Sequence, residues 1–180
     1  MSMDDWLLVI DMQPGFGDPA SPWCVPTYEA CAAKVGALVE AFSERVLFTR
    51  FVPPEEPEGA WVDYYRSHPF AREPGNAGLW DLDPRWSGRT SVASHRFSKW
   101  REAEAVLPAG AGLVICGVAT DCCVLGTAIE ATDAGRSARL VTDACAAGTA
   151  VLHDAALVLL ADRAPVLTFS DTAQEVVASR

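Results

Sequence analysis

The chain has 180 residues, of which 50% are hydrophobic and 21% charged, and its formal net charge is −10. This length suits one domain with a single buried core, and the composition excludes a disordered chain. An acidic surface repels polyanions, so we expect no binding to nucleic acid. We therefore expect one domain over residues 1–180.

The first residues, Met1 to Asp5, are acidic, whereas a signal peptide begins with a positively charged region. The apolar run that follows is too short to span a bilayer. The six cysteines lack paired CxxC spacings and are too sparse for a disulfide scaffold. These features predict a cytoplasmic protein with reduced thiols and no contact with a membrane.

Short apolar runs alternate with helical patterns along the chain, which is typical of βαβ units. The apolar runs predict strands at residues 6–11, 46–49, 90–93, 113–116, 138–142 and 165–169. Helices are predicted over residues 28–42, 121–134 and 150–161. Because the strand runs are continuously apolar, the strands should be buried on both faces. The predicted fold class is α/β, a doubly wound parallel sheet in three layers with helices on both faces.

The segment of residues 52–89 is rich in Pro, Gly, Trp and Tyr and has little periodicity. It is predicted to be a long loop with short helical turns, and such loops inside compact domains are usually functional. Its aromatic residues Trp61, Tyr64, Tyr65 and Trp80 either line a pocket or bury a subunit interface.

Polar residues follow several of the predicted strands, where an open parallel sheet binds its ligands. Asp11 follows the first strand and is either a catalytic carboxylate or a helix or turn cap. Arg50, at the end of the second strand, either binds a substrate carboxylate or forms a structural ion pair.

Cys123 is predicted to lie in the first turn of the helix that follows the fourth strand. The helix dipole there should lower the pKa of the thiol from about 8.5, and free N–H groups of the turn can bind an oxyanion. The alternative is that Cys122 and Cys123 are small apolar residues that pack the helix against the sheet.

The segment LLVIDMQPGF, followed by LVICGVATDCCVLGTAIEATDAG and LVTDACAA, resembles the isochorismatase-like hydrolases, which include nicotinamidases and N-carbamoylsarcosine amidase. The resemblance implies the doubly wound parallel sheet of that family and a triad of Asp, Lys and Cys. In this chain it assigns Asp11 as the acid/base partner and Cys123 as the nucleophile. It further implies a cis peptide bond between Val118 and Ala119, and an oxyanion hole made by the N–H groups of Ala119 and Cys123.

The lysine of the triad is where this chain departs from the family pattern. The pattern places it at the end of the third strand, where this chain has Ser94. Of the two lysines, Lys34 falls in a predicted helix far from the strand ends, which makes Lys99 the candidate. Lys99 either reaches Asp11 and Cys123 as an electrostatic partner or is a solvated charge at a helix start.

The expected reaction is hydrolysis of a small amide, carbamoyl or related carbonyl compound through a thiol acyl-enzyme. Phe16, Arg50, Trp61 and Thr120 are the expected substrate-binding residues. No cofactor or metal is expected, because residues 51–54 lack the Asp-x-His cluster of nicotinamidases and no GxGxxG follows the first strand.

Two alternatives to this function stay open, as does the state of assembly. Without a lysine at Ser94, the chain is alternatively a non-catalytic binding or assembly protein of the same fold. The adjacent Cys122 and Cys123 alternatively form a covalent adduct or undergo redox chemistry. The resemblance implies a homodimer or larger homo-oligomer.

Overall fold

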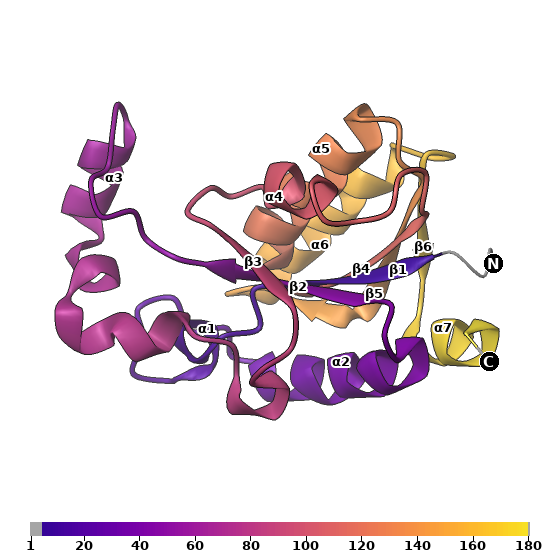
Figure 1. Ribbon diagram of the computed structural model, residues 1–180, viewed down its shortest axis with the longest axis horizontal. Coiled ribbons are helices and arrows are strands. Elements are labelled where there is room, and N and C mark those ends of the chain that lie inside the picture. Colours follow the sequence, from indigo (N-terminus) through magenta and orange to yellow (C-terminus); the bar gives the residue numbers. More distant parts are fainter. Residues whose placement is uncertain (1–4, 180) are drawn as a thin grey trace.

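The computed structural model describes residues 5–179 (Figure 1). Met1–Asp4 and Arg180 lie outside the described residues, as do the corresponding ends of the domain expected over residues 1–180. The expectation that the acidic start of the chain is not a signal peptide also falls largely on these undescribed residues.

A parallel sheet with the strand order β3-β2-β1-β4-β5-β6 forms the centre of the molecule (Figure 1). Its strands are β1 (Trp6–Ile10), β2 (Val46–Phe51), β3 (Ser91–Ser94), β4 (Leu113–Val118), β5 (Ala138–Ala146) and β6 (Leu167–Ser170). The chain first builds the sheet outward from β1 to β3 and then continues on the other side from β4 to β6. The predicted fold class is confirmed, and β1 and β4 flank the switch point where such sheets bind ligands.

The central strands are continuously apolar because they have no solvent-facing side. Leu7 of β1 pairs with Val46 on one side and Val114 on the other. Leu7 and Val114 are fully buried, and Val46 is nearly so. Such strands gain free energy from apolar burial on both faces, at roughly 25 cal/mol per Å² removed from water.

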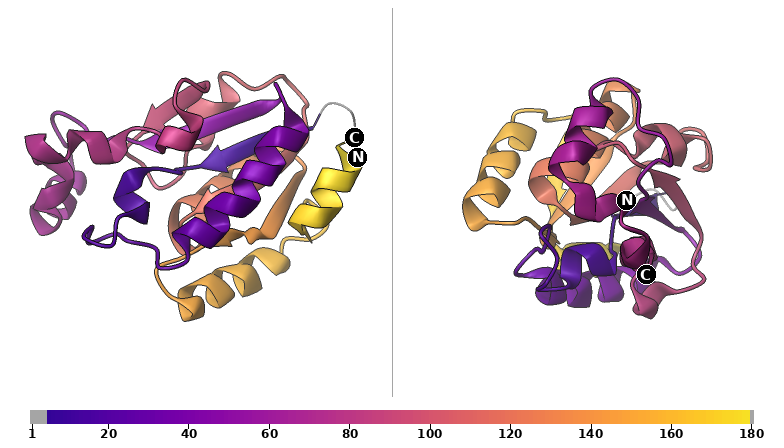
Figure 2. Two further views of the ribbon diagram at one scale, coloured as in Figure 1. Left: turned by 90° about the horizontal axis from the view of Figure 1, so that it is seen from below. Right: turned by 90° about the vertical axis from the view of Figure 1, so that its left-hand side faces the viewer.

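Helices cover both faces of the sheet, as Figure 2 shows. The helices α2 (Tyr28–Phe42) and α7 (Thr172–Ala178) pack on one face. The helices α4 (Trp100–Glu104), α5 (Leu125–Asp133) and α6 (Ala150–Ala161) pack on the other. The predicted bounds of α2 and α6 are those observed, while the helix predicted after β4 begins with a π-helical turn, η4 (Thr120–Val124).

Most of the remaining helical elements lie beyond the carboxyl ends of the strands, at the left of Figure 1. They are α1 (Pro14–Gly17), α3 (Trp61–Ser67) and the 3₁₀ turns η1 (Pro69–Arg72) and η2 (Pro74–Trp80). The turn η3 (Pro84–Trp86) lies instead beside α2, where Arg85 pairs with Glu29 and the ring of Trp86 packs on Phe48 of β2. All but α1 belong to the segment predicted as a long loop with short helical turns. This segment extends over the edge of the sheet where a ligand would enter.

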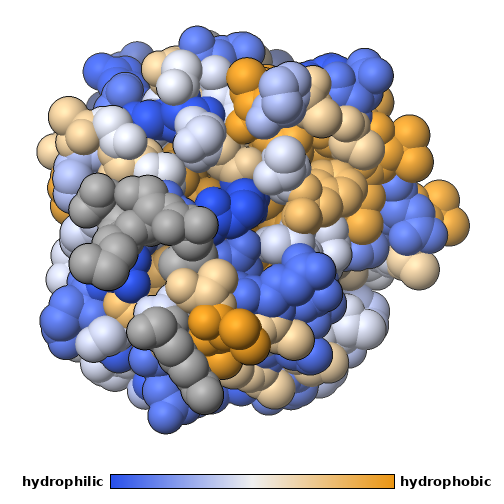
Figure 3. All heavy atoms as spheres, turned by 90° about the vertical axis from the view of Figure 1, so that its right-hand side faces the viewer, coloured by the Kyte–Doolittle hydropathy of each residue, from blue (hydrophilic) through white to orange (hydrophobic). Residues whose placement is uncertain are grey.

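Several large apolar side chains are exposed on α6 and around β6, namely Val151, Val158, Leu159, Val166 and Phe169. Figure 3 views the molecule from the side of β6 and α7, where hydrophobic patches interrupt a mainly hydrophilic surface. None of the helices between residues 5 and 179 is long and apolar enough to cross a membrane.

Candidate active site

Asp11 directly follows β1 and is fully buried. Its backbone has φ 49°, a left-handed conformation that Asp tolerates better than most residues. Thr49 of β2 binds both the backbone and the side chain of Asp11. The Asp11 N–H donates to Thr49 Oγ1 at 3.2 Å, and the Thr49 hydroxyl donates to Asp11 Oδ1 at 2.6 Å. One carboxylate oxygen is thereby bound, and the orientation of the other is fixed.

Lys99 directly precedes α4, and its side chain is fully buried. Its Nζ lies 3.2 Å from Asp11 Oδ2 and donates to the carbonyl oxygens of Ser94 at 3.2 Å and Arg96 at 2.5 Å. The alternative that Lys99 is a solvated charge is therefore wrong. Ser94, which occupies the family's lysine position, contributes its carbonyl oxygen to hold a lysine that arrives from five residues further along the chain.

The charge of Lys99 depends on the acidic groups around it. Burial alone would lower the pKa of the ammonium, but the Asp11 carboxylate and the nearby thiols of Cys123 and Cys122 outweigh this, so the pKa is raised. Lys99 is thus a cation at neutral pH. Asp11 Oδ2 faces this ammonium at 3.2 Å, while the Thr49 hydroxyl binds the other carboxylate oxygen.

Close contact between β1 and β4 places Cys123 at the same end of the sheet. Gly117 of β4 has φ 114°, and a Cβ at this position would overlap the carbonyl oxygen of Ile10. Only glycine permits this approach. The Val118–Ala119 peptide bond that follows is cis, as the resemblance implies, and η4 then carries Cys123.

The thiol of Cys123 is almost fully buried and lies 4.0 Å from the sulfur of Cys122. The expectation that the pKa of this thiol is lowered is wrong. The contact with Cys122, burial and the negative charge of Asp11 raise the pKa, and Lys99 only partly opposes them. Cys123 is therefore a protonated thiol at neutral pH, and a base must remove its proton before it reacts.

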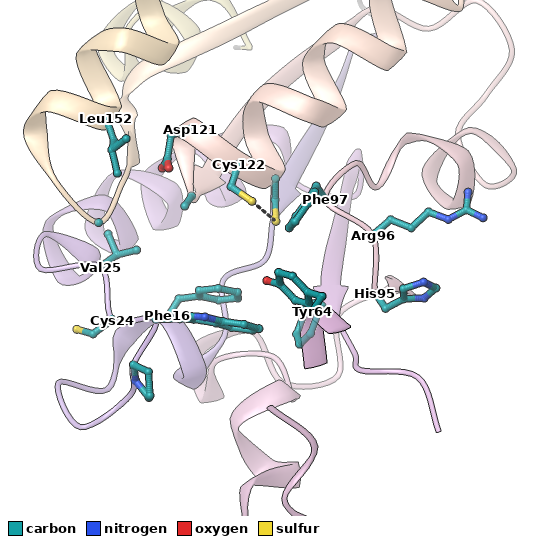
Figure 4. A pocket seen from close by; sticks show the side chains of 16 residues that line it. Phe16, Cys24, Val25, Tyr64, His95, Arg96, Phe97, Asp121, Cys122 and Leu152 are labelled. Carbon is teal, nitrogen blue, oxygen red and sulfur yellow. Dashed lines mark hydrogen bonds between the residues drawn. The ribbon is translucent and has the colours of Figure 1, made fainter. Parts of the chain in front are cut away.

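A cavity of about 260 Å³ opens above Cys123 (Figure 4). Its lining is largely apolar and aromatic: Phe16, Pro22, Trp23, Cys24, Val25, Phe51, Tyr64, His95, Arg96, Phe97, Ala119, Asp121, Cys122, Cys123, Gly148 and Leu152. In Figure 4 the Tyr64 hydroxyl points into the cavity, whereas the side chains of His95 and Arg96 point away from it. Asp11 and Lys99 do not line the cavity and are buried.

The cavity includes some of the residues predicted to bind substrate and omits others. Phe16 and Ala119 line it. Arg50 does not. Its guanidinium bonds to Ser91 Oγ and the Trp80 carbonyl and lies 3.8 Å from Asp81, which favours the structural alternative.

Trp61 and Thr120 also lie outside the cavity lining. Trp61 packs behind the wall, with ring centroids 5.2 Å from Tyr64 and 5.3 Å from Phe97. Thr120 is fully buried, and its hydroxyl is 2.9 Å from His153 Nδ1. Both residues lie behind the cavity lining, and their contact with substrate stays a prediction.

Sequence reasoning missed three polar residues that hold the site. Thr49 orients Asp11, and Thr127 of α5 bonds to both Lys99 and Cys123. The buried amide of Gln13 binds the N–H and carbonyl of Phe51 and the carbonyl of Trp80. The positions of Gln13 and Thr49 near strand ends were the available signal, whereas Thr127 lies inside a helix and offered none.

The residues near Cys123 do not fit a metal ion. Phe51, Val52, Pro53 and Pro54 at the end of β2 bring no metal-binding side chain. Between residues 5 and 179, no three or more His, Cys, Asp and Glu residues are grouped as metal ligands.

Comparison with solved structures finds the same fold over almost the whole chain. A cysteine hydrolase from Pseudomonas syringae pv. phaseolicola 1448A superposes with a TM-score of 0.82 at 17% identity, covering 99% of this chain and 94% of that one. The pyrazinamidase of Pyrococcus horikoshii, in complex with zinc, gives 0.72 at 23% identity, covering 93% and 99%. An isochorismatase family protein from Desulfovibrio vulgaris subsp. vulgaris str. Hildenborough gives 0.74 at 25% identity, covering 98% and 99%.

Comparison with curated proteins finds no match. The family model described as the isochorismatase domain matches residues 5–174, which is most of the chain and includes Asp11, Lys99 and Cys123. The chain therefore belongs to the isochorismatase family of hydrolases.

Proposed function

We propose that the protein hydrolyses a small, uncharged amide, carbamoyl or related carbonyl compound through an acyl-enzyme on Cys123. The observation that carries the proposal is the buried pair of Asp11 and Lys99, 3.2 Å apart, beside a buried thiol that forms part of an apolar cavity. Burying two charges costs free energy that a purely structural core would avoid. Buried ionisable groups next to a cavity are typical of catalytic sites.

The raised pKa of Cys123 assigns the first step to Asp11. With substrate bound, Asp11 Oδ2 takes the thiol proton, and the sulfur attacks the carbonyl carbon. The negative charge that develops on the carbonyl oxygen is stabilised by the N–H groups of Ala119 and Cys123.

The same carboxyl group completes the reaction. Asp11 returns the proton to the leaving amine and then takes a proton from the water that attacks the acyl-enzyme. When the carbon–sulfur bond breaks, Asp11 gives that proton to the released sulfur of Cys123, which restores the starting state. Lys99 remains a cation throughout and stabilises the Asp11 carboxylate each time it has given up its proton. The apolar wall excludes bulk water, which strengthens each of these electrostatic interactions.

The alternative of a non-catalytic protein rested on the missing lysine at Ser94. Lys99 supplies an ammonium group at Asp11 from a different position, so the departure from the family pattern no longer favours that alternative. We also propose that the protein acts in the cytoplasm, because all six cysteines are free. The exposed apolar side chains of α6 favour assembly into a homo-oligomer.

The test is the rate of Cys123 alkylation by iodoacetamide against pH, followed by peptide mass spectrometry in a Cys122→Ala background. Asp11 raises and Lys99 lowers the pKa of the thiol. We therefore expect Asp11→Asn to move the profile to lower pH and Lys99→Met to move it to higher pH, each by about one unit or more. Profiles that stay in place in both variants would refute the proposed site.

A further inference from the structure

The loop that carries Lys99 is hydrogen-bonded to α5, the helix that follows Cys123. The backbone N–H of Lys99 donates to Thr127 Oγ1 at 2.9 Å, and the hydroxyl of Thr127 donates to the Cys123 carbonyl at 2.7 Å. Lys99 and Thr127 are fully buried. One hydroxyl group thus joins two of the three residues proposed to perform the chemistry.

The hydrogen-bonding capacity of a hydroxyl explains why Thr127 can make this connection. Its only proton is committed to the carbonyl of Cys123, four residues earlier in the helical segment. The oxygen lone pairs therefore face outward, where the Lys99 N–H approaches. Thr132 on the same helix makes the same four-residue contact, to Ala128, but its hydroxyl accepts no described hydrogen bond from another segment.

Gly126 supports the same contact by its lack of a side chain. A Cβ at Gly126 would lie 3.3 Å from the backbone N of Ser98 and 3.6 Å from the carbonyl carbon of Phe97. The backbone of the lysine loop therefore rests directly on α5. Contact at Gly126 and hydrogen bonding at Thr127 fix the two residues immediately before Lys99 and the backbone of Lys99 itself.

We propose that Thr127 is a positioning residue, which holds the Lys99 loop against the helix of Cys123 so that Nζ meets Asp11. A lysine at the end of β3 would be placed by the sheet itself. Lys99 instead projects from a loop five residues later, so its ammonium group needs a second attachment. The proposal rests on the function proposed above, since it assigns Thr127 a role through Lys99.

The experiment compares the pH profile of Cys123 alkylation in Thr127→Val, Thr127→Ser and Thr132→Val, all with Cys122→Ala. Thr127→Val keeps the side-chain shape but removes the oxygen, and we expect its profile to move to higher pH by about half a unit or more, as in Lys99→Met. Thr127→Ser retains the hydroxyl and should restore the parent profile. Thr132→Val removes a hydroxyl that does not touch Lys99 and should leave the profile in place.

Two further variants keep the result interpretable. Adding Thr127→Val to Lys99→Met should cause no additional shift, because Thr127 acts through the lysine. If Thr127→Val fails to fold, Gly126→Ala replaces it, since the added Cβ presses on Ser98 and should move the profile in the same direction. An unchanged profile in the folded variant, or an equal shift with and without Lys99, would overturn the role of Thr127. No shift in Lys99→Met itself would instead refute the proposed function.

Discussion

The buried ion pair between Asp11 and Lys99 makes a prediction about folding that does not depend on the substrate. Two unit charges 3.2 Å apart attract each other by about 5 kcal/mol at an effective dielectric constant of about 20. Neither side chain is exposed to solvent. Asp11→Asn or Lys99→Met alone therefore leaves an uncompensated buried charge, and we expect each to lower the free energy of unfolding by about 3–5 kcal/mol.

The double variant Asp11→Asn/Lys99→Met removes both charges and should be more stable than either single variant. Urea unfolding at pH 7 of all four proteins measures the coupling energy, which we expect to be about 3 kcal/mol or more. Lys34 and Asp143 form a matched control, because they lie 3.0 Å apart but are 50% and 35% exposed. Their coupling should be below about 1 kcal/mol. Additive losses at Asp11 and Lys99 would refute the ion pair as the feature that fixes the site.

Three further predictions test other parts of the structure. Cys31 is buried with its pKa raised to about 12, mainly by burial and also by Asp143. Because an unfolded thiol ionises near pH 8.5, this residue should remove about 1.4 kcal/mol of unfolding free energy per pH unit above that value. Cys31→Ala should therefore reduce the slope measured by urea unfolding between pH 9 and 11 by about that amount, while the buried thiols of Cys116, Cys123 and Cys145 maintain the rest. Arg50→Ala should leave the pH profile of Cys123 alkylation unchanged, because Arg50 does not line the cavity. A shifted profile would show that Arg50 acts on Cys123. Gln13→Ala leaves backbone groups of Phe51 and Trp80 without hydrogen-bond partners and should lower the free energy of unfolding by about 3 kcal/mol in thermal or urea unfolding. A decrease below about 1 kcal/mol would contradict the buried network.

The sheet could be predicted from the sequence because its strands are buried on both faces. Runs such as Trp6–Ile10 and Leu113–Val118 are continuously apolar, and the long helices Tyr28–Phe42 and Ala150–Ala161 have enough turns to show an apolar pattern. The helices Trp100–Glu104 and Thr172–Ala178 were not predicted, since five to seven residues are too few to establish a period.

The site was predictable where a residue follows directly from a strand, and less so where tertiary contacts decide its environment. Asp11 directly follows β1, and Cys123 lies in the helical turn that follows β4; the pattern around them indicates both. The environment of Cys123 was misjudged, because local sequence indicates the helix dipole but not the contact between the two thiols, the burial and the facing Asp11 carboxylate, which together raise the pKa of Cys123. Lys99 illustrates the same point: its sequence position allows a solvated or a buried charge, and only the packing of its loop on Thr127 distinguishes them.

The acyl-enzyme on Cys123 is the central claim, and p-nitrophenyl acetate tests it most directly because its leaving group needs no proton. In Asp11→Asn the carboxylate no longer raises the pKa of the Cys123 thiol, so the thiol can lose its proton to solvent base and be acetylated. No carboxylate then activates the water that must release the acyl group. Intact-protein and peptide mass spectrometry should therefore find one acetyl group accumulating on Cys123 of Asp11→Asn, while the protein with Asp11 turns over. Acetylation of Cys122 instead, or no difference between the two proteins, would contradict the account.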